Sequence, residues 1–106
     1  MTVSSIETLK DLVDPLSLMT ALGFSVYYDN QDEIRAPCVL HGGDNKTAFC
    51  FRKSVNRFYC YSHGCEVDDS GEVQNDIVSL VMKANHCSFI EAVKFLSQLT
   101  GFDVEI

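Results

Sequence analysis

Two short clusters of cysteine and histidine give this chain its clearest chemical pattern. Cys38 and His41 have two residues between them, and a second cluster begins at Cys60 and ends at Cys65. Thiolate and imidazole are ligands that zinc prefers, and a short spacing lets two of them come from one tight turn. The two clusters are separated by about the length of a β-hairpin. The sequence therefore predicts one Zn²⁺ held by four side chains.

The fourth ligand can be assigned in two ways. Cys60 and Cys65 enclose four residues, whereas Cys60 and His63 have the commoner spacing of two residues. We expect Cys65 to be the ligand, because thiolate binds zinc strongly and Gly64 directly before it suits a tight turn. His63 is the alternative ligand, or else a close neighbour of the site. Four protein ligands leave no open position for water, so a structural role is expected.

Disulfide bonds and a catalytic thiol are less favoured roles for these cysteines. The chain has five cysteines, an odd number that cannot all pair within one chain, and grouping with histidine favours a metal site over disulfides. A catalytic cysteine and histidine pair would need an orienting group and an oxyanion site, and nothing else in the sequence resembles either. Cys50 and Cys87 are interpreted as single buried cysteines. We expect a protein that is not an enzyme by itself.

Short helices and strands must position the two clusters. Capping residues and apolar spacing predict four helices, and alternation predicts a hairpin before Cys38 and two strands between the clusters. The helices are expected over residues 5–13, 15–22, 77–86 and 89–100, and the strands over 24–28, 34–37, 48–52 and 57–61. The expected fold is α+β, a zinc ribbon with a small antiparallel sheet and flanking N- and C-terminal helices. Residues 1–106 should form a single domain.

Composition restricts the classes of partner. The formal net charge is -7, and an acidic chain of this kind does not wrap nucleic acid by bulk electrostatics, so any contact must be local. No apolar run is long enough to cross a bilayer, and residues 1–5 do not begin a secretory signal. We expect a protein of the cytoplasm with no membrane partner.

Several segments occur in the order and spacing of one known family. They are Pro37-Cys38-Val39-Leu40-His41, Thr47-Ala48-Phe49, Phe58-Tyr59-Cys60-Tyr61 with Gly64-Cys65, residues 76–82, and Ser88-Phe89-Ile90-Glu91-Ala92. Together they resemble the zinc-binding domain of bacterial and phage DnaG-type DNA primases. The resemblance spans nearly the whole chain and implies the same zinc-ribbon fold.

The sequence departs from the family pattern at three places. The second cluster is longer than the usual two-residue spacing, and residues 66–74 replace a glycine-rich turn. The chain also stops at Ile106, where a primase continues into the domain that makes primers. The resemblance therefore implies a non-catalytic part of a primase, encoded by a phage or mobile element. It would act with a polymerase domain or a helicase, either in trans or on a longer chain.

The resemblance also implies a ligand, because the family's zinc domain reads single-stranded template DNA during replication. Aromatic faces can stack bases while cations hold phosphates. The candidate residues lie on the two strands between the clusters: Phe49, Phe51, Arg52, Lys53, Arg57, Tyr59 and Tyr61. The alternative is an acidic protein-interaction module of the same fold that does not bind DNA. Exposed aromatic side chains beside Arg52 and Arg57 would favour DNA, and buried ones would favour a protein partner.

Overall fold

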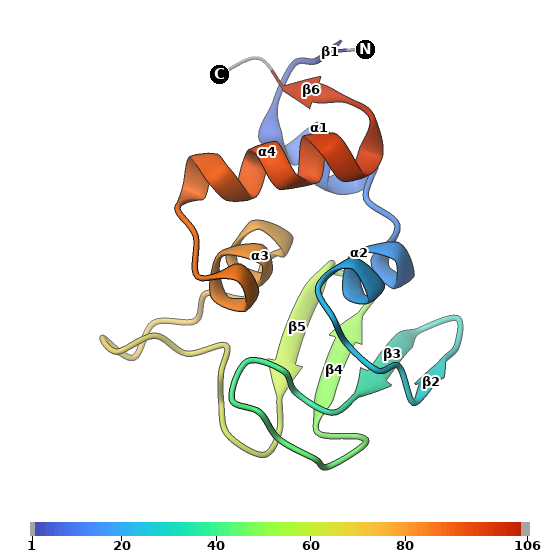
Figure 1. Cartoon of the computed structure of the whole chain (residues 1–106), viewed down its shortest axis with the longest axis vertical. Coiled ribbons are helices and arrows are strands. Elements are labelled where there is room, and N and C mark those ends of the chain that lie inside the picture. Colours follow the sequence, from blue (N-terminus) through green and yellow to red (C-terminus); the bar gives the residue numbers. More distant parts are fainter. Residues whose placement is uncertain (1, 105–106) are drawn as a thin grey trace.

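The chain contains a four-stranded antiparallel sheet with strand order β2-β3-β4-β5 (Figure 1). The computed structural model describes residues 2–104. The strands are β2 (Tyr28–Asp29), β3 (Glu33–Ala36), β4 (Phe49–Arg52) and β5 (Arg57–Cys60). The first predicted strand is shorter than expected, because Phe24 lies in the core just after a helix rather than in the sheet.

One face of the sheet is buried against the helices. Side chains alternate across a strand, and the antiparallel register places Phe49 opposite Cys60 and Phe51 opposite Phe58. All four side chains are buried. The ring of Phe49 lies 4.4 Å from that of Phe24 and 5.6 Å from that of Phe58, measured between centroids. This aromatic cluster fixes the sheet on the helical layer.

Two helices precede the sheet and two follow it. They are α1 (Ile6–Asp11), α2 (Pro15–Ala21), α3 (Ile77–Asn85) and α4 (Phe89–Thr100). The side chains of Asp14 and Asp76 cap α2 and α3, and Ser88 forms a capping box with Glu91 at α4. The prediction of an α+β fold with a small antiparallel sheet and helices at both ends is confirmed.

A pair of two-residue strands joins the two ends of the described chain. Strand β1 (Thr2–Val3) lies parallel to β6 (Asp103–Val104), and α1 packs against α4 beside them. Figure 1 shows this arrangement at the end of the molecule opposite the metal-binding loops. No pattern in the sequence predicts this pairing. Among residues 2–104, no helix has the length and apolar character needed to cross a membrane.

Candidate metal centre

Four side chains from the two clusters meet at one point. One ligand atom from each of Cys38, His41, Cys60 and Cys65 lies within 4.8 Å of all the others. Cys38 Sγ is 3.8 Å from Cys65 Sγ, while His41 Nδ1 is 3.6 Å from Cys60 Sγ and 3.1 Å from Cys65 Sγ. Tetrahedral zinc, with bonds of about 2.3 Å to sulfur and about 2.0 Å to nitrogen, has edges of about 3.8 Å and about 3.5 Å. The group therefore fits one structural Zn²⁺.

The first ligand turn depends on glycine. Cys38 follows β3, and the backbone N–H of Gly43 donates to the carbonyl of Cys38 at 2.9 Å, which folds the chain back over His41. A Cβ atom on Gly43 would lie 2.5 Å from His41 Nε2. Only glycine leaves room there for the imidazole in its ligating orientation.

The second ligand turn is held at both ends. Cys60 ends β5, and the N–H of Gly64 donates to the Cys60 carbonyl at 2.9 Å, with Gly64 at a φ of +64°. The Glu66 carboxylate accepts from the Cys60 N–H at 2.9 Å, and Lys83 on α3 donates to the Cys65 carbonyl at 3.0 Å. The longer turn between Cys60 and Cys65 is thus held in place by the side chains of Glu66 and Lys83.

His63 lies outside the group of four. Its ring stacks on that of His41, with centroids 4.5 Å apart and planes 16° apart. Ser62 Oγ is 3.5 Å from His41 Nε2 and 3.7 Å from Cys60 Sγ. These two residues surround the imidazole on its outer side, where a polar partner orients a ligating histidine. The structure thus brings together the ligand set with Cys65 rather than the alternative set with His63.

The thiols differ in acidity because their surroundings differ. Burial raises the pKa of Cys38, and burial together with the neighbouring thiols raises the pKa of Cys65. Burial also acts on Cys60, but hydrogen bonds from the Cys65 backbone and the Ser62 hydroxyl lower its pKa overall. Zinc binds thiolates, so metal binding displaces thiol protons, and the raised pKa values of Cys38 and Cys65 oppose that step.

No model of a known protein family matches the chain. No curated protein matches it in sequence either. The likeness to primase zinc domains therefore stays a prediction that rests on the residues named above, while the metal-binding geometry stands on the structure.

The outer face of the sheet, which points away from the helices, holds only part of the predicted DNA-binding set. Phe49 and Phe51 are 0 % exposed, so their inclusion was wrong, because a base cannot stack on a ring that packs in the core. Lys53 forms an ion pair with Asp29 and a hydrogen bond to the Asn30 carbonyl, so its ammonium group is already paired within the protein. The remaining members, Arg52, Arg57, Tyr59 and Tyr61, lie on the outer side.

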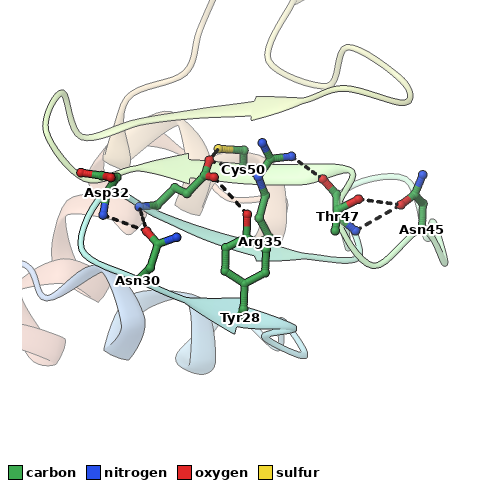
Figure 2. Close-up of polar contacts among 8 residues, drawn as sticks. Tyr28, Asn30, Asp32, Arg35, Asn45, Thr47 and Cys50 are labelled. Carbon is green, nitrogen blue, oxygen red and sulfur yellow. Dashed lines mark hydrogen bonds and ion pairs between the residues drawn. The ribbon is translucent and has the colours of Figure 1, made fainter.

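Sequence reasoning missed a polar network on the same face. Glu33 Oε2 accepts from Arg35 Nε at 3.1 Å and from Cys50 Sγ at 2.9 Å, while Glu33 Oε1 accepts from the Tyr28 hydroxyl at 3.0 Å. Figure 2 shows Tyr28, Arg35 and Cys50 close together on this face of the sheet. The guanidinium of Arg35 lies 5.0 Å from the ring centre of Tyr61. The network depends on the cross-strand register, Tyr28 opposite Arg35 and Arg35 opposite Cys50, which the alternation of the strands does not give.

The two remaining cysteines do not join the metal centre. Cys50 is buried, and burial together with the hydrogen bond to Glu33 raises its pKa to about 11, so the thiol stays protonated near neutral pH. Cys87 is half-buried, and its thiol donates to the Val81 carbonyl at 3.8 Å. Cys50 therefore matches the prediction of a single buried cysteine, and Cys87 is more exposed than predicted.

Proposed function

We propose that the chain is a non-catalytic, zinc-binding module that recognises single-stranded DNA through the outer face of its sheet. The observation that supports this most is the position of Tyr59 and Tyr61 on either side of the ligand Cys60. Their rings are parallel within 6° with centroids 6.3 Å apart, and Tyr61 is 56 % exposed. Aromatic platforms of this kind stack bases with little dependence on sequence.

Alternation along the chain couples the metal to this face. Cys60 points inward and is buried, so its neighbours on both sides point outward. The backbone of Tyr61 also donates to the Ala48 carbonyl at 2.8 Å, which continues the ladder beyond β5. A metal that fixes Cys60 therefore fixes both tyrosines. This coupling gives the structural zinc a role in recognition.

The positive charge of the chain is concentrated near the same face. Five of the eight Lys and Arg residues lie between positions 35 and 57, namely Arg35, Lys46, Arg52, Lys53 and Arg57. Within residues 2–104, neither Arg52 nor Arg57 takes part in an ion pair, and both are exposed. These two guanidinium groups are available to phosphates although the whole chain is acidic.

By analogy with primase zinc domains, which this sequence resembles, the module would present template to a polymerase domain or helicase. The test is a fluorescence-anisotropy titration of the zinc-loaded protein with single-stranded and duplex oligonucleotides at low and moderate salt. We expect salt-sensitive binding that favours the single strand. Arg57→Ala should weaken binding and reduce the salt slope by about 0.7, the value per single-strand phosphate, whereas Lys94→Ala on α4 should change neither.

An acidic protein-interaction module is the second candidate. The exposed loop at residues 66–74 carries Glu72 and Asp69 at the surface and favours a basic partner. Absence of binding to either form of DNA at low salt would contradict the proposal and favour this candidate. Equal effects of Arg57→Ala and Lys94→Ala would count against the proposed face.

A further inference from the structure

Two tyrosines at the edge of the sheet, Tyr27 directly before β2 and Tyr28 within it, form an exposed aromatic pair beside the Glu33 network. Tyr27 is 56 % exposed and Tyr28 is 37 % exposed. Their rings meet edge to face, with centroids 6.0 Å apart and an interplanar angle of 65°. Lys46 Nζ lies 5.5 Å from the ring centre of Tyr27. Exposed aromatic rings with a cation beside them are the elements that stack bases and hold phosphates.

The sheet register aligns Tyr28 with Tyr59 of β5. Tyr28 lies opposite Arg35, Arg35 opposite Cys50, and Cys50 opposite Tyr59. Directly paired residues share a face, so this row runs straight across the outer side of the sheet. Three strand spacings separate Tyr28 from Tyr59, which is about 14 Å. In RNA-recognition modules, aromatic side chains on a four-stranded sheet stack about two or three bases.

A single carboxylate joins the two tyrosine pairs. Glu33 accepts from the Tyr28 hydroxyl on one side and from Arg35 on the other, and Arg35 also donates to the Thr47 carbonyl at 2.7 Å (Figure 2). The same guanidinium lies over the Tyr61 ring. Because Arg35 neutralises Glu33, the middle of the row does not repel phosphate as a free carboxylate would. Hydrogen bonds and a cation–π contact therefore connect Tyr28 to Tyr61 across the row, and the Glu33 carboxylate between them is paired.

We propose that Tyr27 and Tyr28 form a second base-stacking subsite, so that single-stranded DNA crosses the sheet from β5 to β2 at right angles to the strands. Tyr59 and Tyr61 form the first subsite, and Lys46 holds a phosphate at the second. This inference rests on the proposed function and extends it, because it sets the direction of the bound strand and the minimum length that fills the site.

The test measures affinity as a function of oligothymidine length, from the dinucleotide to the decanucleotide. The shortest oligonucleotides are followed by NMR titration and the others by fluorescence anisotropy. Tyr27→Ala should leave affinity for the dinucleotide unchanged and lower affinity for the decanucleotide by about 5- to 150-fold, the effect of one stacked base. Tyr61→Ala should lower affinity at every length. Phe89→Ala, which removes an aromatic ring that is 44 % exposed on α4, is the matched control.

Two results would overturn part or all of this account. If the unmodified protein binds no oligonucleotide, the proposed function fails, and this inference fails with it. If the unmodified protein binds but Tyr27→Ala matches Phe89→Ala at every length, only the second subsite is overturned. Lys46→Gln leaves the backbone and the ring in place, and it should give the same length dependence with a smaller loss even if Tyr27→Ala folds poorly.

Discussion

Replacing Asp76 by alanine should loosen the attachment of α3 to the N-terminal helix. The Asp76 carboxylate accepts from the Ser79 N–H at 2.8 Å, which caps α3, and from Lys10 Nζ of α1 at 3.0 Å. The side chains of Lys10 and Asp76 are 12 % and 26 % exposed, so the ion pair is partly shielded from water. One residue therefore caps a helix and joins two elements that are distant in the sequence.

The expected loss follows from these two contacts. Removing an N-cap side chain costs about 0.5–2 kcal/mol. Losing a hydrogen bond between charged groups costs about 1.5–3 kcal/mol, and we take about 1 kcal/mol here because Lys10 keeps its contact with Glu7 and the pair is partly exposed. Asp76→Ala should lower the free energy of unfolding by about 1.5–3 kcal/mol in total. Asp14→Ala removes only a cap, at α2, and should cost about 1 kcal/mol.

Urea unfolding of the zinc-loaded proteins measures both effects. The midpoint should move further for Asp76→Ala than for Asp14→Ala, with the denaturant slope unchanged in each. Equal midpoints for the two variants would refute the idea that the contact with Lys10 contributes to stability. A changed slope would instead show that the variant has altered the unfolded or native ensemble.

The same carboxylate predicts a dependence on pH. Burial would raise the pKa of Asp76, but hydrogen bonds from Ser79 and the ammonium of Lys10 lower it below the ordinary 3.8. A carboxyl with a lowered folded pKa contributes stability that is fully present above its unfolded pKa and is lost as pH falls through the folded value. Asp76→Asn keeps a capping oxygen without the charge. The difference in stability between the unmodified protein and Asp76→Asn should therefore shrink as the pH is lowered below 3.8.

Three further substitutions test the site. Gly43→Ala should weaken zinc binding, because its methyl group would displace the His41 ring. Cys65→Ser should lose the full equivalent of zinc that His63→Ala retains, as measured by metal analysis of the purified proteins. Glu33→Gln should weaken binding of single-stranded DNA although it removes a negative charge, because the neutral amide oxygen accepts from Arg35 more weakly than the carboxylate and holds it less firmly over the Tyr61 ring; anisotropy measures the affinity.

Each of these has a control or a result that would contradict it. Asp44→Asn removes one exposed negative charge from the loop between β3 and β4, outside the Glu33 network, and should slightly strengthen DNA binding. If Glu33→Gln behaves like Asp44→Asn, the carboxylate does not position Arg35. Unchanged zinc affinity in Gly43→Ala would show that the first ligand turn accommodates a side chain. Loss of zinc in His63→Ala would assign His63 to the ligand set.

The helices could be predicted because their ends are encoded locally. Asp14, Asp76 and the pair Ser88 and Glu91 cap helices where the sequence places them. The first helix shows the limit of such signals. Ser4 has capping-box spacing to Glu7, but the structure uses Ser5, whose hydroxyl accepts from the Thr8 N–H at 3.2 Å. The parallel pair β1 and β6 could not be predicted, since two-residue strands carry no alternation.

The metal ligands were predictable from residue type and spacing, but the outer face of the sheet was not fully so. Alternation alone groups Phe49 and Phe51 with Tyr59 and Tyr61, because all four have odd numbers. The register decides otherwise: Cys50 lies opposite Tyr59, so even positions of β4 share a face with odd positions of β5. The loop between β4 and β5 sets that register, and it cannot be read from the alternation of either strand.

The central proposal is that a zinc centre holds a tyrosine face that binds single-stranded DNA. The measurement that tests it most directly is oligothymidine binding by the zinc-loaded protein, by the same protein after chelation, and after zinc is restored. Binding should be present with zinc, absent after chelation and recovered with zinc, because Cys60 and its flanking tyrosines are fixed together. Equal affinity with and without bound metal, or no binding by the zinc-loaded protein, would contradict the proposal.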